Sequence, residues 1–299
     1  MTPPVDLLRS WLFTGGVDTR SHEAACACGA DVIGQDLEDF TPPALRPQAH
    51  ALAARLYAQW RAAGALAAVR VNPLDPLDPL DGGGFADLAA VMPARPDIVM
   101  LPKTVSPEQI IALDAAIARE EARCGIAPGS TAIVPNVETA AGVVATGAIV
   151  RASPRIRACL VGAEDMAADL CAERGRDGIE LVYVRSRFLV ECRAAGVEPI
   201  DAPYTYADAE GCERETRMAR RLGYRAKSLV RPEHAAIVNA VLTPSAAECA
   251  YAQRVVDAFE AARARGEDRV NVDGALIEVP AYLNALRLLE RARRLAQRP

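Results

Sequence analysis

The sequence predicts a TIM (β/α)8 barrel followed by a C-terminal helical extension. Short apolar runs alternate with segments rich in Ala, Leu and Arg, and the alternation occurs eight times within the 299 residues. Several runs are apolar throughout, as is typical of parallel strands that are covered on both faces. The competing fold is a doubly wound sheet, which usually carries a Gly-rich phosphate turn after its first strand. This chain has Thr14-Gly15-Gly16 there.

Eight strands are expected where the apolar and β-branched runs lie between turn-forming residues. They cover residues 10–14, 31–36, 66–71, 97–101, 131–135, 156–161, 197–201 and 225–230. The segments between them have the period of amphipathic helices. Helices are therefore predicted near residues 20–28, 44–63, 85–92, 107–123, 140–151, 179–195, 208–222 and 233–240.

Two further helical segments follow the eighth unit, near 245–265 and 280–296, and a short stretch at 272–278 separates them. We therefore divide the chain into a catalytic barrel, residues 1–243, and a helical extension, residues 244–299. A complete barrel does not need this extension. It is expected to contribute to an oligomer and to closure of the active site, either over its own barrel mouth or at a neighbouring subunit.

Composition argues against several classes of protein. The net charge is −5, with 34 Lys and Arg against 39 Asp and Glu, and 5% of residues are aromatic, so no nucleic-acid partner is expected. The most apolar window, residues 132–150, contains Pro135, Asn136 and Glu138, which a membrane-spanning helix tolerates poorly. The start of the chain does not resemble a secretory leader, and the eight cysteines are scattered. A reduced, cytoplasmic protein without a membrane partner is expected.

Charged and polar side chains occur where the predicted strands end. In a barrel of this kind the carboxyl ends of the strands meet on one face, and chemistry takes place there. The residues predicted for this rim are Asp36, Glu38, Asp39, Arg70, Asn72, Lys103, Asn136, Glu138, Glu164, Asp165, Asp201 and Arg231. Together they would place carboxylates and cations around the mouth of the barrel, which suits a metal ion and an anionic substrate.

Glu138 and Asp165 are the best candidates for metal ligands. Each follows an apolar run, and the two runs are predicted to be neighbouring strands. Two carboxylates, with water and substrate oxygens completing an octahedron, usually hold Mg²⁺ in proteins. The alternative is that both residues cap the helices that follow. The three histidines are isolated and no G-x-S-x-G occurs, which disfavours a zinc centre and a serine hydrolase.

A series of short motifs connects these residues in order along the chain. They are residues 9–13 (RSWLF), 35–39 (QDLED), 70–72 (RVN), 101–103 (LPK), 138–142 (ETAAG), 162–165 (GAED), 199–201 (PID), 222–224 (LGY) and 273–280 (DGALIEVP). In this order and spacing they make the chain resemble the citrate lyase β-subunit-like family of the HpcH/HpaI aldolase superfamily, which is related to malyl-CoA and citramalyl-CoA lyases. The resemblance covers nearly the whole chain.

The resemblance implies a divalent ion at Glu138 and Asp165, Mg²⁺ or alternatively Mn²⁺, because hard oxygen ligands suit both. It implies that Arg70 grips the carboxylate and the oxyanion of a 2-oxo acid such as oxaloacetate, pyruvate or glyoxylate. A lysine cannot copy that bidentate clamp. The reaction implied is the reversible cleavage of a 3-hydroxyacyl-CoA thioester into an acyl-CoA and the 2-oxo acid.

Other residues receive roles on the same basis. Glu38 and Asp39 are assigned to the catalytic centre, where they orient Arg70 and the waters of the metal ion. The alternative for them is an ion-pair cluster at the rim. Arg9 and Lys103 are assigned to substrate binding together with Arg70 and Glu138, with cations near the mouth meeting the phosphates of CoA.

The related lyases place a catalytic aspartate in the C-terminal segment, contributed by a neighbouring subunit. Here the matching residue is Glu278, whose carboxylate lies one methylene further out. Such a base takes a proton from the 3-hydroxyl in cleavage or from the acyl methyl in condensation. The resemblance therefore implies a homotrimer or a hexamer. Two alternatives stay open: a metal-dependent aldolase acting on a free hydroxy-oxo acid without CoA, and a low-activity, metabolite-binding subunit of a larger lyase complex.

Overall fold

The structure, a computed structural model, describes residues 4–74 and 83–298. Eight parallel strands form a closed barrel in which each strand pairs with the next and β8 pairs with β1. The strands are β1 (Ser10–Gly15), β2 (Val32–Asp36), β3 (Leu66–Arg70), β4 (Ile98–Leu101), β5 (Ala132–Val137), β6 (Ala158–Val161), β7 (Glu198–Asp201) and β8 (Ala226–Leu229). The predicted TIM barrel is confirmed.

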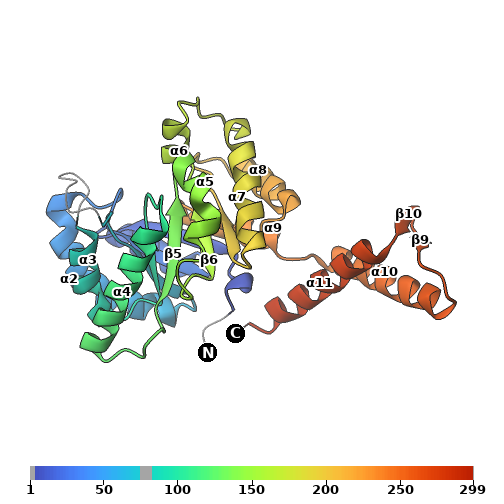
Figure 1. The fold of residues 1–299 in the computed structure, drawn as a ribbon, viewed down its shortest axis with the longest axis horizontal. Coiled ribbons are helices and arrows are strands. Elements are labelled where there is room, and N and C mark those ends of the chain that lie inside the picture. The colour runs from blue at the N-terminus through green and yellow to red at the C-terminus, as the bar shows by residue number, and fades with distance from the viewer. Residues whose placement is uncertain (1–3, 75–82, 299) are drawn as a thin grey trace. The chain divides into compact units, whose positions relative to one another are not determined.

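Helices follow the strands and cover the outside of the barrel (Figure 1). They are α1 (Thr19–Ala27), α2 (Arg46–Ala62), α3 (Gly84–Val91), α4 (Pro107–Cys124), α5 (Ala140–Ile149), α6 (Glu164–Asp169), α7 (Val182–Ala194), α8 (Ala209–Leu222) and α9 (Ala235–Leu242). Short 3-10 helices lie at Val5–Leu7, Pro43–Leu45, Met92–Ala94, Ile179–Leu181 and Pro232–His234. Of these α-helices only α6 was not predicted, because six residues are too few to show a helical period.

Local sequence determines where several of these helices begin and end. The Thr139 side chain accepts a hydrogen bond from the backbone N–H of Gly142 at 3.1 Å and so caps α5. Ser106 and Gln109 form a reciprocal capping box at the start of α4. The same helix ends at Gly125, whose φ of 62° belongs to the left-handed region that glycine adopts without strain.

The barrel interior is filled by one apolar face of every strand. Buried side chains that form this core include Trp11, Phe13, Val32, Ala68, Met100, Val134, Leu160, Ile200 and Ala226. Successive side chains of a strand point to opposite faces, so residues two positions further along continue the same face. Asp36, Arg70 and Glu138 therefore project from the interior face at the carboxyl ends of their strands.

A buried ion cluster joins β7, β8 and α7. Arg185 donates to both carboxylate oxygens of Asp201, at 2.8 and 2.9 Å, and Lys227 contacts the same carboxylate at 2.6 Å. A second carboxylate, that of Glu215 on α8, accepts from Arg185 at 3.0 Å. Arg185, Asp201 and Lys227 are each at most 2% exposed, so every member depends on its partners for solvation.

The chain divides into two compact units, Met1–Ala240 and Val241–Pro299. The second unit contains α10 (Ala246–Ala264), the antiparallel pair β9 (Val270–Val272) and β10 (Ala275–Ile277), and α11 (Val279–Ala296). It has its own small core, in which the rings of Phe259 and Tyr282 stack at 4.8 Å. Its expected part in oligomer formation and site closure stays a prediction.

Two expectations from composition can be compared with the structure. The apolar window at 132–150 forms β5 and α5, and no helix in the described part of the chain is long and apolar enough to cross a membrane. The eight cysteines are free, and Cys159, Cys192 and Cys212 are buried.

Candidate active site

Arg70, the last residue of β3, occupies the centre of the rim at the carboxyl ends of the strands. Its Nε donates to Oδ1 of Asp36, the last residue of β2, at 2.9 Å. Its Nη1 lies 2.9 Å from Oε2 of Glu38, and its Nη2 donates to Oδ2 of Asp39 at 3.0 Å. Three carboxylates, one at the end of β2 and two in the loop after it, thus hold one guanidinium, whose fork matches carboxylate geometry.

Two aromatic rings complete the surroundings of this guanidinium. The Arg70 Cζ atom lies 5.0 Å from the ring centre of Phe13 and 5.9 Å from that of Phe40. Burial disfavours the charge of Arg70, but Asp36 and the other acids raise its pKa well above the usual value. Arg70 is therefore charged and held in one orientation before any substrate arrives.

Glu138 lies beside this cluster. Its Oε1 is 3.7 Å from Nη1 of Arg70, and its Oε2 accepts from the backbone N–H of Lys103 at 2.9 Å. The Lys103 side chain pairs with Glu38 at 3.0 Å. Lys103 has a φ of 48°, and a residue other than glycine in this region is strained. Strain of this kind concentrates at functional sites, and here it aims the backbone N–H at Glu138.

The acids of this cluster carry raised pKa values. Burial raises the pKa of Glu138 to about 8, and the charges of Glu38 and Asp165 add to the shift against the opposing effect of Arg70. Burial also raises the pKa of Asp165, and the charge of Asp39 acts in the same direction. Asp165 stands in the first turn of α6, directly after β6. Carboxylates that repel one another in a buried place are stabilised by a cation.

The residues present fit a hard divalent cation. Glu138 and Asp165 offer carboxylate oxygens, the donors that Mg²⁺ prefers. Among residues 4–74 and 83–298, no group of three or more His, Cys, Asp and Glu side chains is arranged to enclose a metal ion. An ion held by Glu138 and Asp165 would therefore need water and substrate oxygens to complete its coordination, as is usual for Mg²⁺.

The raised pKa of Glu138 predicts how stability depends on pH. A carboxyl whose pKa is higher in the folded chain stabilises the fold at low pH, and this contribution disappears as the pH rises through the folded value. For Glu138 the window runs from the usual 4.5 to about 8. We expect the melting temperature of the metal-free protein to fall across that window. The fall should be smaller in Glu138→Gln and smaller again when Mg²⁺ is added. If the melting temperature fell equally with pH in the metal-free wild type, in Glu138→Gln and in the protein with Mg²⁺, this explanation would be contradicted.

Gly162, which follows β6, is predicted to be required for the position of Glu138. A Cβ atom on Gly162 would lie 2.6 Å from Cγ of Glu138, so Gly162→Ala must displace that side chain. We expect Mn²⁺ or Mg²⁺ affinity to fall by about 10-fold or more, measured by titration calorimetry. Gly34→Ala is the control, because its nearest neighbour, the Leu12 carbonyl oxygen, lies at an ordinary 3.6 Å. Equal affinities in the two variants would disprove the role of Gly162.

Comparison with known proteins places this site in a family. A family model described as HpcH/HpaI aldolase/citrate lyase matches residues 9–232. The chain belongs to this family. It is 33% identical over 295 residues to the citrate lyase subunit beta of Haemophilus influenzae, a match that covers 96% of this chain and 97% of the relative.

A second relative and a solved structure agree with membership of this family. The chain is 30% identical over 304 residues to an L-malyl-CoA/beta-methylmalyl-CoA lyase of Cereibacter sphaeroides, covering 95% of this chain and 94% of that one. CitE of Mycobacterium tuberculosis, solved with magnesium, acetoacetate and coenzyme A, superposes with a TM-score of 0.75 at 28% identity, covering 95% of this chain and 98% of that one. This member of the HpcH/HpaI family is therefore a lyase.

The structure of this HpcH/HpaI lyase brings most of the predicted site residues together. The residues gathered at the rim are Glu38, Asp39, Arg70, Lys103, Glu138 and Asp165, with Asp36. Arg9 is not among them. It precedes β1, at the opposite end of the barrel, and pairs there with Asp31 at 3.0 Å. Its assignment to CoA binding is therefore not retained.

Glu278 lies in the second unit. It stands at the start of α11, is exposed, and makes no side-chain capping hydrogen bond. Its catalytic role stays a prediction.

Other rim residues have structural partners. The Glu164 carboxylate accepts from Thr205 at 2.8 Å and from Arg174 at 3.2 Å, across the loops after β6 and β7. Asp201 belongs to the buried ion cluster, and Arg231 lies 3.4 Å from Glu233.

Sequence reasoning underestimated Asp36 and gave no role to Phe40 or to Gly162, although Gly162 belongs to the motif at 162–165. Asp36 was placed on the rim, but Glu38 and Asp39 were preferred as partners of Arg70. Strand alternation places both Asp36 and Arg70 on the interior face, but their contact depends on the ladder between β2 and β3, in which the two residues are paired. The contact of Gly162 with Glu138 depends on how β5 and β6 pack, which has no counterpart in the sequence pattern.

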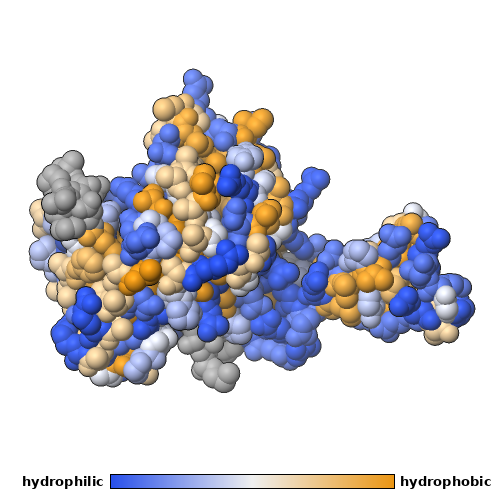
Figure 2. Space-filling model, viewed as in Figure 1, coloured by the Kyte–Doolittle hydropathy of each residue, from blue (hydrophilic) through white to orange (hydrophobic). Residues whose placement is uncertain are grey.

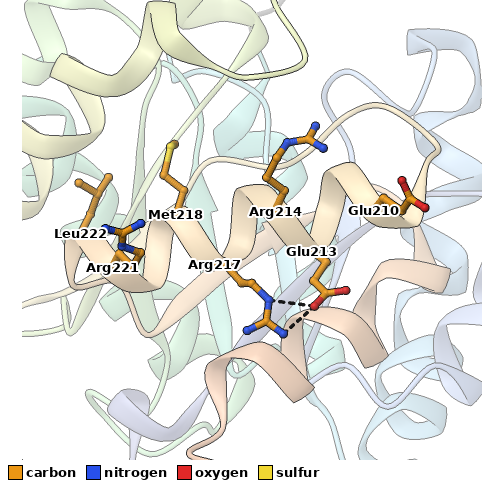
Figure 3. Close-up of a pocket in the computed structure, with 7 residues that line it drawn as sticks. All are labelled: Glu210, Glu213, Arg214, Arg217, Met218, Arg221 and Leu222. Carbon is orange, nitrogen blue, oxygen red and sulfur yellow. Dashed lines mark hydrogen bonds and ion pairs between the residues drawn. The ribbon is translucent and has the colours of Figure 1, made fainter.

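A hollow of about 710 Å³ lies elsewhere, along the outer face of α8 (Figure 3). Its lining residues, Glu210, Glu213, Arg214, Arg217, Met218, Arg221 and Leu222, all belong to that single helix. Arg217 is paired with Glu213 at 2.6 Å (Figure 3). The hollow contains none of the predicted catalytic residues, so the rim cluster is the candidate site.

Proposed function

We propose that this HpcH/HpaI lyase is a Mg²⁺-dependent carbon–carbon lyase that cleaves, or forms, a 3-hydroxyacyl-CoA thioester. The products of cleavage are an acyl-CoA and a 2-oxo acid. The observation that carries the proposal is the buried Arg70 guanidinium among four acids, with Asp165 beside them. Further structures of the M. tuberculosis protein, which hold magnesium with oxaloacetate and with pyruvate, support the choice of an oxo acid.

Arg70 binds the carboxylate of the oxo acid in this proposal. Asp36 is completely buried and holds Nε, whereas Asp39 is 45% exposed and Glu138 stands 3.7 Å away. A substrate carboxylate can replace the exposed or distant acids without freeing the guanidinium from Asp36. Arg70 thereby stays oriented while it exchanges one carboxylate for another.

Glu138 and Asp165 would hold the metal ion, which, when bound, polarises the oxygen that becomes the oxo group. The Lys103 ammonium, paired with Glu38 and 35% exposed, brings a positive charge to the rim for the anionic substrate. Burial raises the pKa of Glu38 to about 7, and its carboxylate pairs with Arg70 at 2.9 Å and with Lys103 at 3.0 Å, which keeps both cations in place.

A base from a neighbouring subunit completes the proposed site. Glu278 would take this role in a homotrimer or hexamer. Apolar side chains on the outer faces of α5 and α7 support an oligomer, since Val144, Tyr183 and Val190 are 65%, 71% and 63% exposed. Figure 2 shows hydrophobic surface over these helices. Ile179, just before α7, adds to this apolar surface with 73% exposure.

Mixing two inactive variants tests whether the site is shared. Glu138→Gln and Glu278→Gln are each expected to be inactive alone. If Glu138 of one subunit works with Glu278 of another, random mixed oligomers should recover about a quarter of wild-type activity. Glu290→Gln, an exposed change on the same helix as Glu278, serves as the control and should keep full activity. No recovery in oligomers shown to be mixed would place both residues on one subunit, whereas a Glu278→Gln variant that is active alone would remove Glu278 from the mechanism.

A cleavage assay on the purified chain tests the proposal as a whole. Malyl-CoA, citramalyl-CoA and citryl-CoA are each supplied with Mg²⁺, with Mn²⁺ or with EDTA, and free oxo acid is measured. We expect metal-dependent release from at least one thioester. Release only from free hydroxy-oxo acids would instead establish an aldolase that does not need CoA.

A second function is favoured by the names of the relatives. Those at 33% identity are subunits of citrate lyase, and the chain covers nearly all of their length. The alternative is therefore a metabolite-binding subunit with little activity alone. A chain that binds Mg²⁺ and an oxo acid, but turns over thioesters only with added partner subunits, would support this alternative.

A further inference from the structure

Asn136 lies on the interior face of β5, directly below the candidate site. Val134 belongs to the barrel core, and Asn136 and Glu138 follow it at intervals of two residues on the same face. In the ladder Asn136 is paired with Leu160, another residue of the interior core. Val137, between Asn136 and Glu138, packs the other way, against α5 near Gly142. The Asn136 carboxamide is therefore directed into the barrel.

The polar atoms of this carboxamide have no partner within the described part of the chain. Asn136 is completely buried, yet neither Nδ2 nor Oδ1 makes a hydrogen bond there. Its backbone carbonyl is satisfied, because it accepts from Thr104 N–H at 3.0 Å. A buried amide without partners destabilises a fold, whereas a leucine of similar size would not. A polar side chain in this position thus points to a partner that arrives with the ligand.

The layers around Asn136 show which part of a ligand reaches it. Beside it lies Leu160, and below it the barrel is apolar, with Val134 and Met100. Above it Arg70 and Glu138 form the charged layer. In the proposed function, this charged layer binds the carboxylate and the oxo oxygen of the oxo acid. The acyl-CoA enters from the mouth, so the remaining substituent of the oxo acid points down toward Asn136.

We propose that Asn136 is a specificity-determining residue that hydrogen-bonds this substituent and selects a 2-oxo acid with a polar group on C3. Oxaloacetate, with a carboxylate there, and hydroxypyruvate, with a hydroxyl, belong to this class. Pyruvate, with a methyl hydrogen in place of the hydroxyl, and glyoxylate, which lacks C3, do not. The inference rests on the proposed function and makes it more specific. A site built to hydrogen-bond a polar group discriminates strongly against the analogue that lacks it.

Binding of four oxo acids to the full chain in Mg²⁺ tests the inference without a turnover assay. Dissociation constants are measured by calorimetry for oxaloacetate, hydroxypyruvate, pyruvate and glyoxylate. We expect the wild type to bind the better of the two polar acids at least about 10-fold more tightly than pyruvate. In Asn136→Leu this ratio should fall to about threefold or less. Met100→Leu, a change of similar volume in the same interior, is the control and should leave the ratio unchanged.

Thermal unfolding of the same variants separates a ligand-binding role from a structural one. If Asn136 is unpartnered in the free protein, Asn136→Leu should raise the melting temperature. A lower melting temperature with an unchanged binding ratio would show a structural residue and overturn the inference. Should Asn136→Leu fail to fold, Asn136→Ser, which keeps a shorter polar group, must weaken binding of the polar acids selectively.

The outcomes also distinguish this inference from the proposed function. If the oxo acids bind in Mg²⁺ but the wild type shows no preference for a polar C3 group, the proposed function stands and the inference fails. If none of the four binds, both fail together.

Discussion

Replacing Glu138 by glutamine is expected to abolish metal-dependent cleavage while leaving the fold intact. The amide has the size of the carboxylate but lacks the charge that holds a divalent cation. Burial already disfavours that charge, since it raises the pKa of Glu138 to about 8. The metal-free variant should therefore be as stable as the wild type at neutral pH, or more stable. We expect turnover to fall by about 1,000-fold or more, with loss of Mn²⁺ binding measured directly.

Glu164→Gln is the matched control for this experiment. Glu164 precedes the second proposed metal ligand, is 54% exposed, and binds Arg174 and Thr205 rather than the central cluster. Its neutralisation should change activity by less than about 10-fold, since exposed ion pairs contribute little. Metal-dependent activity that survives in Glu138→Gln would remove Glu138 from the proposed metal site.

Asp201→Ala is expected to have the largest effect on stability. Its carboxylate is completely buried and solvates both Arg185, at 2.8 Å, and Lys227, at 2.6 Å. Burial alone would raise the pKa of Asp201, but these two cations lower it below its usual value. Removing the carboxylate leaves two buried cations, Arg185 with Glu215 at 3.0 Å and Lys227 with the Ala202 carbonyl at 2.6 Å, which should reduce the free energy of unfolding by about 3–5 kcal/mol. Urea unfolding measures this difference.

Two variants test whether the loss of stability in Asp201→Ala comes from the buried cations that lose their carboxylate. Glu213→Ala breaks an exposed pair with Arg217 on α8 and should cost less than about 1 kcal/mol. Adding Lys227→Met to Asp201→Ala removes one of the stranded cations and should recover part of the lost stability. A loss in Asp201→Ala no larger than in Glu213→Ala would show that the buried cluster does not stabilise the barrel.

The barrel could be predicted closely because its strands are local sequence features. Predicted and observed strands differ at their ends by no more than two residues, as at 131–135 against Ala132–Val137. Apolar runs between turn-forming residues are visible without knowledge of the partner strands. The α-helix and the strands that were missed, α6, β9 and β10, are six or three residues long, too short for any period.

The candidate site could be predicted in part. Arg70, Glu138 and Asp165 were found because each follows directly on an apolar run, and strand ends meet on one face of a barrel. Arg9 was assigned to the same site on its charge and motif, although it precedes its strand and so belongs to the opposite end. The distinction between the start and the end of a strand was available in the sequence and should have excluded it.

The contacts between individual side chains of the site could not be predicted from the sequence. The sequence determined which residues reach the rim, because strand position and alternation are properties of the chain itself. Only the tertiary structure decided that Asp36 holds Arg70, that Gly162 leaves room for Glu138, and that Asn136 is buried without a partner. These facts depend on the register between strands and on distances of a few tenths of an ångström, which side-chain packing sets and residue identity alone does not.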